Sequence, residues 1–254
     1  MSRPVALVTG ARRGIGRAIG VALARQGYDI GFTDLVEDED VAEAAQAFAE
    51  AGARTRFVLH DVSRVETHPS LVAEVICAFG SLHCFVSNAG IGSVVRGDML
   101  DLAPDHWDHV LGVNLRGAAM LSQAAARAIL HTGPDQPRSI VFVTSVSAEM
   151  ASPERADYCV SKAGLSMWAK ALALRLAPDA VPVFEVRPGI IRTAMTEAVA
   201  AAYEDRIVAG LVPARRWGEA EDVGRAVAAL ASGAFGFATG SIVACDGGLS
   251  VARL

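Results

Sequence analysis

The sequence has few cysteines and places none of them in a ligand motif. Its four cysteines, Cys77, Cys84, Cys159 and Cys245, form no C-x-x-C pair, and no histidines cluster beside them. The sequence therefore predicts neither a disulfide framework nor a zinc site, and we expect no metal. This cysteine usage is typical of the reducing cytoplasm, which is the expected localisation.

Concentrated positive charge and long apolar runs are also missing. Asp and Glu outnumber Lys and Arg by 28 to 23, and the nearest approach to a basic cluster is the pair Arg12 and Arg13. Nucleic acids and anionic membranes bind larger basic patches, so we expect neither as a partner and favour a small molecule. The apolar run after Met1–Pro4 has five residues, too few for a signal peptide or a membrane span.

No repeat, low-complexity stretch or linker divides the chain. Short β-branched runs alternate with alanine-rich stretches, which predicts strands at residues 5–9, 29–33, 56–60, 82–87, 139–144, 181–186 and 241–245, and helices at residues 15–26, 38–51, 66–79, 105–114, 118–130, 157–176 and 220–231. Strands that are apolar on both faces require a parallel sheet covered on both sides. We therefore predict one α/β domain over residues 1–254, a doubly wound Rossmann-type parallel sheet of about seven strands with helices on both faces.

A glycine-rich turn follows the first expected strand. It runs Thr9-Gly-Ala-Arg-Arg-Gly-Ile-Gly16 and opens a helix. Glycines allow a tight turn and a close approach of the backbone to a pyrophosphate, and the helix N-terminus offers unpaired N–H groups to that anion. Similar turns occur without a ligand, but the place after the first strand of an alternating chain favours a dinucleotide cofactor.

Two opposed charges bear on which nicotinamide nucleotide binds. Asp34 ends the second expected strand, where a carboxylate can accept both hydroxyls of an adenosine ribose and repel a 2′-phosphate. Arg13, beside the glycine turn, can instead pair with that phosphate. A simple helix-capping role for Asp34 is the third reading. Position and charge together favour NAD, with NADP as the alternative.

Tyr158 and Lys162 stand four residues apart in the expected helix at 157–176, so they project from one helix face. A phenol has a pKa of about 10, and a nearby ammonium lowers it toward the range of efficient acid–base catalysis. The same spacing also occurs between ordinary surface residues. Ser145 strengthens the catalytic interpretation, because it follows an expected strand at the edge where ligands bind and can hydrogen-bond a substrate oxygen. Ser147 is its rival.

With these motifs the chain resembles the short-chain dehydrogenase/reductase family from end to end. The matching features besides the glycine turn are Asp61-Val62, Asn88-Ala89-Gly90, Asn114, Ser145, Tyr158-x-x-x-Lys162, Arg187-Pro188-Gly189 and Asp246-Gly247-Gly248. The turn and Arg216-Trp217-Gly218 look most like the 3-oxoacyl-[acyl-carrier-protein] reductase branch. Ser87 departs from the family, which usually has Asn at that position.

The resemblance implies a role for each matching residue. The catalytic tetrad would be Asn114, Ser145, Tyr158 and Lys162, with Asn114 holding a water that links Lys162 to solvent. The implied cofactor contacts are Gly10, Arg12, Arg13, Gly14, Ile15, Gly16, Asp34, Asp61, Val62, Asn88, Ala89, Gly90, Tyr158, Lys162, Pro188, Gly189, Ile190 and Thr193.

Several of these cofactor contacts have specific places in the family. Asp61 would accept from the adenine amino group, and Asn88 would lie beside the adenosine ribose. Pro188 and Gly189 would pass beneath the nicotinamide, with Ile190 and Thr193 bonding its carboxamide.

The implied function is NAD(P)-dependent hydride transfer between nicotinamide and a carbonyl or secondary alcohol. The main hypothesis is a 3-oxoacyl-[acyl-carrier-protein] reductase of fatty acid metabolism. A polyol, sugar or other secondary-alcohol dehydrogenase, of which the first two are somewhat favoured by Asp34, is the alternative, and a non-catalytic dinucleotide sensor is disfavoured by the intact tetrad.

The expected partners are a carbonyl or alcohol substrate, either free or bound to an acyl-carrier protein, and further copies of the chain. A homotetramer is implied by the family and by the apolar faces of the helices at 118–130 and 157–176. Specificity is expected in residues 92–97, 149–155 and 189–214. Candidates for a basic rim that meets an acyl-carrier protein are Arg96, Arg155, Arg192, Arg215 and Arg216.

Overall fold

The computed structural model describes residues 3–197 and 200–253. The strands are β1 (Val5–Thr9), β2 (Asp29–Asp34), β3 (Thr55–Leu59), β4 (Cys84–Ser87), β5 (Ser139–Val143), β6 (Val183–Pro188) and β7 (Ile242–Cys245). The helices are α1 (Gly14–Arg25), α2 (Glu39–Glu50), α3 (His68–Phe79), α4 (Pro104–Leu111), α5 (Ala118–Leu130), α6 (Ala156–Leu176), α7 (Ala194–Glu197), α8 (Ala200–Val208) and α9 (Ala220–Ala231).

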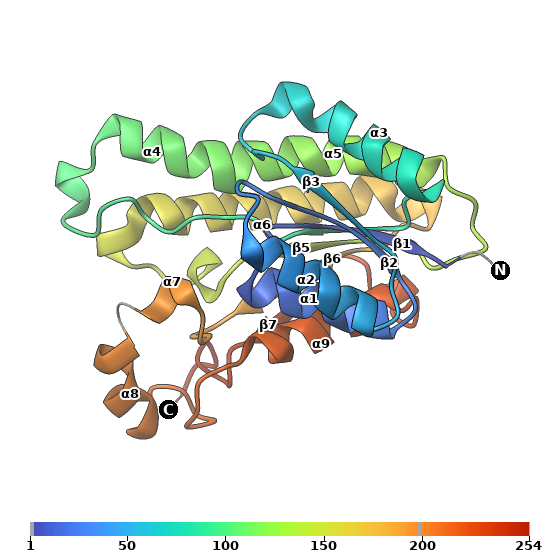
Figure 1. Cartoon of the computed structure of the whole chain (residues 1–254). Helices are drawn as coiled ribbons and strands as arrows, with labels where there is room; N and C mark the ends of the chain where they lie inside the picture. The colour runs from blue at the N-terminus through green and yellow to red at the C-terminus, as the bar shows by residue number, and fades with distance from the viewer. Residues whose placement is uncertain (1–2, 198–199, 254) are drawn as a thin grey trace.

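The strands form a seven-stranded sheet in the order β3-β2-β1-β4-β5-β6-β7. Neighbouring strands pair in parallel throughout. Helices α3, α4, α5 and α6 cover one face, and α1, α2 and α9 cover the other (Figure 1). The predicted doubly wound sheet is confirmed. The strand order reverses between β1 and β4, which is where ligands bind in folds of this type.

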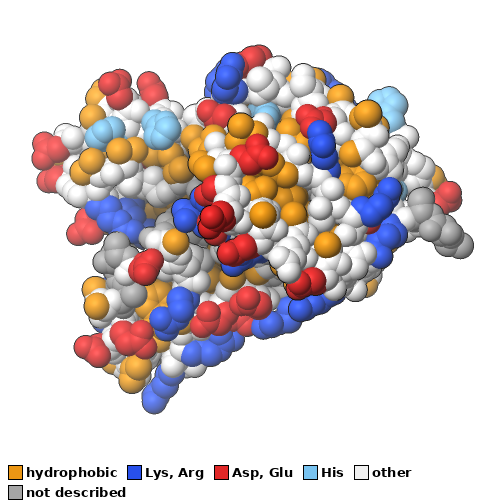
Figure 2. Space-filling model, viewed as in Figure 1, with side chains coloured by type: hydrophobic (Ala, Val, Ile, Leu, Met, Phe, Trp, Pro, Cys, Tyr) orange, Lys and Arg blue, Asp and Glu red, His pale blue; other side chains and the backbone are white. Residues whose placement is uncertain are grey.

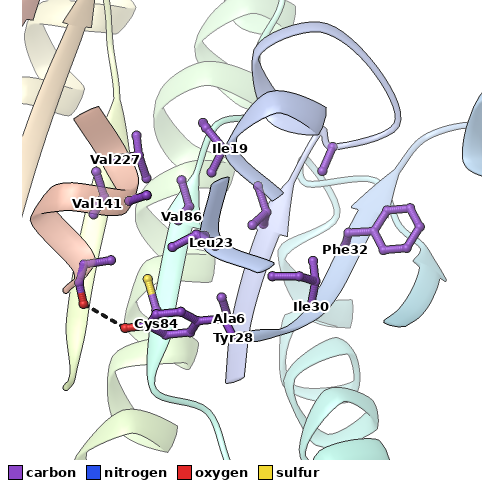
Figure 3. Packing of buried hydrophobic residues seen from close by; sticks show 14 of the residues in the cluster. Ala6, Ile19, Leu23, Tyr28, Ile30, Phe32, Cys84, Val86, Val141 and Val227 are labelled. Atoms are coloured by element: carbon purple, nitrogen blue, oxygen red, sulfur yellow. Dashed lines mark hydrogen bonds between the residues drawn. The ribbon is translucent and has the colours of Figure 1, made fainter. Parts of the chain in front are cut away.

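A hydrophobic core lies on each side of the sheet. Every residue of β1 is buried, and its side chains alternate between the two cores: Ala6 and Val8 pack under α1 and α9, whereas Val5 and Leu7 pack under α3 and α5. Figure 3 shows the first of these cores, where the buried Tyr28 hydroxyl donates to the backbone carbonyl of Ala231 over 2.7 Å. This bond ties the start of β2 to the end of α9.

The expected elements all appear, with small shifts at several of their ends and one internal difference. Residues 82 and 83 precede β4, and residues 187 and 188 extend β6. The expected helix at 105–114 ends as an α-helix at Leu111 and continues as a π-helical segment, Gly112–Gly117, before α5 begins. Such wide turns inside helices are frequent at functional sites.

The segment after Gly189 is more ordered than the loop we expected. It carries the short helices α7 and α8, which stand at the end of the molecule opposite the N-terminus (Figure 1). A small separate core of Ile207, Val212 and Trp217 holds this segment together. Trp217 also donates its indole N–H to Glu204 over 2.7 Å. The segment therefore has a packed structure of its own beside the carboxyl edge of the sheet.

Acidic and basic side chains are interspersed over the face drawn in Figure 2. Within residues 3–197 and 200–253, no helix combines the length and the apolarity that crossing a membrane requires.

Candidate active site

The glycine-rich turn connects β1 to α1 at the carboxyl edge of the sheet. A Cβ atom on Gly16 would lie 2.1 Å from the Gly10 carbonyl oxygen, so only glycine fits there. By contrast, a Cβ on Gly14 would meet nothing closer than Thr193, at 3.7 Å. The turn is therefore tightly packed behind and open in front, at the start of α1. This shape suits the pyrophosphate of a dinucleotide.

Thr9 and Asn88 tie the two strands at the switch point to each other. The Thr9 hydroxyl accepts from the backbone N–H groups of Asn88 and Ala89, each over 3.0 Å. The Asn88 amide donates back to the carbonyls of Thr9 and Gly10, at 2.9 and 3.0 Å. The Asn88 side chain thus holds the glycine turn in place, and its amide hydrogens are already used there. Sequence reasoning quoted Thr9 only as the first letter of the motif and missed this bracing function.

Asp34 lies at the end of β2, as expected, and faces Arg12. The Arg12 Nε lies 3.6 Å from Asp34 Oδ1, an ion pair without a hydrogen bond. The Arg12 Nη1 also binds Asp38, and it binds Asp40 over 2.9 Å. Three carboxylates therefore share one nearly buried guanidinium. The nucleotide end therefore carries excess negative charge. The sequence alone did not reveal that Asp38 and Asp40 contribute to it.

Arg13 is placed differently from Arg12. It precedes α1, it is exposed, and it forms no ion pair with any residue that the structure describes. It therefore remains available to an anionic ligand at this rim. Arg12 does not, because its charge is taken up by its carboxylate neighbours.

The remaining residues expected around the nucleotide lie at or after the ends of three strands, β3, β4 and β6. Asp61 and Val62 follow β3, and one Asp61 oxygen accepts from the backbone N–H and hydroxyl of Ser63, at 2.8 and 2.7 Å. Ala89 and Gly90 follow β4. Pro188 ends β6, and the segment after it brings Thr193 next to Gly14 of the glycine turn. The structure thus gathers these positions along one edge of the sheet.

Tyr158, Lys162 and Ser145 meet between β5 and α6. The Lys162 ammonium lies 5.8 Å from the centre of the Tyr158 ring and donates to the Val143 carbonyl over 3.3 Å. The Ser145 hydroxyl lies near enough to the Tyr158 phenol to lower its pKa, and it accepts from the Ser147 N–H over 3.1 Å. Of the two rival serines, the structure therefore brings Ser145 to the tyrosine.

Burial controls the proton affinities in this group. It raises the pKa of Tyr158, and the nearby Ser145 hydroxyl and the charge of Arg155 only partly oppose it. Burial also lowers the pKa of Lys162 to about 8, against the raising effect of Glu185. Our expectation that the ammonium lowers the tyrosine pKa is wrong for this structure. The desolvation of the phenol outweighs the favourable charges around it.

Asn114 lies in the π-helical segment and is fully buried. Its side-chain oxygen accepts from the Ile91 N–H over 2.8 Å, and its amide donates to the Ile91 carbonyl over 2.8 Å and to the Ser161 hydroxyl over 3.1 Å. The widened turn therefore aims this side chain at the backbone beside Gly90. A Cβ on Gly90 would lie 3.1 Å from Asn114 Oδ1 and 3.3 Å from Lys162 Nζ, so glycine keeps these groups close.

Two polar clusters near this group escaped sequence reasoning. Asp157 precedes Tyr158, is buried, and accepts from the Ser93 hydroxyl and from the Tyr158 N–H. Glu185, inside β6, is equally buried and binds the Arg187 of the quoted Arg-Pro-Gly motif. A carboxylate inside an otherwise apolar strand was the signal that could have revealed Glu185.

The comparison with protein families gives one decisive match. The family profile described as "Enoyl-(Acyl carrier protein) reductase" matches residues 10–250, which includes both the glycine turn and the Tyr158–Lys162 pair. The chain belongs to the short-chain dehydrogenase/reductase family. The family resemblance seen in the sequence is thereby confirmed.

Individual relatives in this family agree with the match. A 3-oxoacyl-[acyl-carrier-protein] reductase from Staphylococcus epidermidis is 32% identical over 245 residues, covering 96% of this chain and 98% of the relative. A (3R)-3-hydroxyacyl-CoA dehydrogenase from Canis lupus familiaris is 34% identical, with 96% and 95% covered. The structure of a 3-oxoacyl-[acyl-carrier protein] reductase from Brucella melitensis in complex with NAD superposes with a TM-score of 0.97 at 52% identity, covering both chains completely.

These matches establish the reaction class. As a short-chain dehydrogenase/reductase, the protein is an NAD(P)-dependent oxidoreductase that transfers hydride between nicotinamide and a carbonyl or secondary alcohol. The glycine cradle and the open start of α1 fit the cofactor that this class uses.

Proposed function

We propose that this short-chain dehydrogenase/reductase reduces 3-oxoacyl groups carried as thioesters, with Tyr158 as the proton donor. The observation that carries the proposal is the meeting of Ser145, Tyr158 and Lys162 at the carboxyl edge of the sheet. Relatives of this chain that are 3-oxoacyl-[acyl-carrier-protein] reductases support the substrate class.

Each side chain of the group has a role in the proposed reaction. When bound, the nicotinamide supplies the hydride that reaches the carbonyl carbon. The Tyr158 hydroxyl gives its proton to the carbonyl oxygen, while Ser145 donates a hydrogen bond to that oxygen as negative charge develops. Lys162 stabilises the resulting phenolate by its charge. Asn114 holds the Ile91 backbone and Ser161 in place beside Lys162.

The nucleotide in this proposal is NAD(H). Asp34, Asp38 and Asp40 outnumber the single guanidinium of Arg12 where the adenosine ribose of a Rossmann cofactor lies. A 2′-phosphate placed there would meet uncompensated negative charge. Arg13 is exposed and has no ion-pair partner among the described residues, so it can pair with the 2′-phosphate of NADP(H). We therefore expect measurable activity with NADP(H) as well.

Docking of an acyl-carrier protein requires arginines at the mouth of the site that are not already paired with carboxylates. Arg192 lies 3.8 Å from both Glu204 and Glu219, and Arg216 binds Asp222 over 2.7 Å. Arg96, Arg155 and Arg215 form no ion pair with any residue of the described ranges. We therefore propose that these three, out of the five candidate arginines, form the docking rim.

We also propose a homotetramer. The outer surface of α6 leaves Met167 and Leu174 exposed, and a groove of about 320 Å³ runs between α5 and α6 around Trp168. Phe237 and Ile242 are exposed at the β7 edge. Two separate apolar surfaces of this kind are what a tetramer with two kinds of contact needs.

A substrate panel tests the proposed activity. The purified protein is assayed with acetoacetyl thioesters of pantetheine, coenzyme A and acyl-carrier protein, and with polyols and sugars, each with both nucleotides. We expect kcat/KM to be highest for a 3-oxoacyl thioester with NADH. The excess of carboxylates at the nucleotide end favours the polyol or sugar dehydrogenase as the second candidate, since NAD suits oxidation. Turnover of polyols without turnover of any thioester would establish that candidate instead.

A further inference from the structure

A buried carboxylate lies behind the catalytic group and belongs to none of the roles above. Glu185 sits in the middle of β6 and is 2% exposed. Its oxygens accept three hydrogen bonds: from the Thr144 hydroxyl over 2.6 Å, from the Ser166 hydroxyl over 2.7 Å and from the Arg187 Nε over 2.7 Å. Burying an ionised carboxylate is costly, and this full set of charged and polar partners offsets the cost.

The partners of Glu185 are neighbours of the residues assigned to catalysis. Thr144 stands between Val143, whose carbonyl accepts from the Lys162 ammonium, and Ser145. Ser166 lies one helical turn after Lys162 on α6. The carboxylate therefore joins the strand end that carries Ser145 to the helix that carries Tyr158 and Lys162. This arrangement links the two segments whose side chains are proposed to act together.

Glu185 also lies near two cations, Arg187 and Lys162. Arg187 binds it directly and donates in addition to Ser166 over 3.0 Å and to the exposed Glu149 over 2.6 Å. Among the described residues, the titratable groups near Lys162 are Tyr158 on its own helix and Glu185 on β6. From β5 it meets the Val143 carbonyl, and from the π-helical segment and the loop at Gly90 it meets Asn114 and backbone. Arg155 faces the Tyr158 ring at 5.6 Å.

We propose that Glu185 is a positioning residue, which clamps the Ser145 strand end to α6 and supplies the counter-charge shared by Arg187 and Lys162. This inference rests on the proposed roles of Tyr158 and Lys162. Arg187 acts with it by holding the carboxylate from the other side.

The sign of the electrostatic effect follows from the charges. A negative charge raises the pKa of each group that it faces, and Glu185 opposes the lowering of the Lys162 pKa by burial. Removing that charge lowers the pKa of the Tyr158–Lys162 pair as a whole, whichever of the two loses the proton. Carbonyl reduction needs this pair to be protonated, so the rate falls at high pH, where the pair loses a proton. Without the Glu185 charge, this fall in rate moves to lower pH. Removing Arg187 leaves the carboxylate unopposed and moves the fall in rate to higher pH.

The experiment measures kcat for carbonyl reduction against pH in the parent and in three variants, with an active 3-oxoacyl thioester or, failing that, any carbonyl substrate from the panel. Glu185→Gln keeps the shape and the acceptor oxygen but loses the charge, and its alkaline limb shifts down by about one pH unit. Arg187→Met shifts the limb up by a smaller amount. Asp179→Asn removes a carboxylate from the exposed ion pair with Arg175, and its limb stays where the parent has it, because solvent screens that pair.

A conservative replacement of Glu185 separates the effect of its charge from the effect of its side-chain length. Glu185→Asp keeps the charge but shortens the side chain, so kcat falls while the limb stays near that of the parent. Binding of NADH, followed by its fluorescence, and the unfolding temperature show that each variant is folded. If Arg187→Met does not fold, Glu185→Gln and Glu185→Asp still provide the test.

Unmoved pH limbs in Glu185→Gln and Arg187→Met, or shifts of equal sign, would overturn the inference and leave Glu185 as a packing residue. Failure of the proposed function has a different signature, since Tyr158→Phe would then keep near-parent turnover. An inactive Tyr158→Phe together with an unmoved limb in Glu185→Gln rejects the positioning role alone.

Discussion

Each end of the site places an arginine against carboxylates, but the two arrangements differ in burial and in charge balance. At the nucleotide end Arg12 meets Asp34, Asp38 and Asp40, which are 19%, 40% and 37% exposed. At the catalytic end Glu185, 2% exposed, lies with Arg187 and close to Lys162. Solvent reaches the first cluster, so its excess negative charge acts mainly by repelling ligands of the same sign. The second cluster is desolvated, so its charges change proton affinity.

The largest expected effect tests the catalytic end alone. Tyr158→Phe removes the transferable proton and keeps the ring that Lys162 and Arg155 face. We expect kcat to fall by about 10²–10⁴-fold, the usual contribution of a general acid or base. Binding of NADH, measured by its fluorescence, should persist because the nucleotide end is untouched. A variant with near-normal kcat would show that another group transfers the proton.

The next effect tests the nucleotide end. The parent should prefer NAD(H) over NADP(H) by about tenfold or more in kcat/KM, equivalent to about 1.4 kcal/mol. Asp34→Ala should narrow or reverse that ratio, because it removes repulsion of the 2′-phosphate and leaves Arg13 in place. The measurement is kcat/KM for both nucleotides in the parent and the variant. If the parent prefers NADP(H), or if the substitution leaves the ratio unchanged, Asp34 does not control the choice of nucleotide and is only a residue of the turn after β2.

The other carboxylates around Arg12 sharpen this test. In Asp34→Ala the guanidinium keeps its contacts with Asp38 and Asp40 and stays unavailable. Adding Asp38→Asn and Asp40→Asn releases Arg12, so the triple variant should favour NADP(H) more strongly than Asp34→Ala does. Glu43→Gln, which breaks an exposed pair with Arg17 on the same surface, serves as the control and should leave the ratio near that of the parent.

The smallest expected effect is on the stability of the fold, and it comes from three buried histidines that belong to neither cluster. Burial lowers the pKa of His60, His68 and His83. A lowered folded pKa means that the unfolded chain binds more protons as pH falls below about 6.5, the ordinary value for histidine. The stability that these neutral imidazoles contribute is therefore complete above that pH and is lost progressively below it.

Thermal unfolding at several pH values between neutral and mildly acidic measures this loss. A destabilisation of 1 kcal/mol corresponds to about 2–4 °C in Tm for a chain of this size. His60→Gln should reduce the pH dependence, whereas the same substitution at the exposed His109 should not. A Tm that stays constant from pH 7.5 to about pH 5.5 would contradict the expected linkage.

Local patterns explain why so much of the fold could be predicted. Continuous apolar runs and helical periodicity record burial directly, and the glycine turn, Ser145 and the Tyr158–Lys162 spacing are all short-range features. The helices α7 and α8 were missed because they are short and depend on the separate core around Trp217. The π-helical segment was missed because its register is set by the bonds between Asn114 and Ile91, which lie far apart in the sequence.

The sequence by itself determined the doubly wound sheet, the family and the residue types gathered at the carboxyl edge. Each of these follows from local periodicity or from motifs that place backbone and side chains over a few residues. Only the tertiary structure decided that burial, more than the Lys162 charge, sets the proton affinity of Tyr158, that Arg12 is occupied by three carboxylates, and that Glu185 lies behind Lys162. These depend on desolvation and on charges brought together from distant segments, and neither is written in the spacing of neighbouring residues.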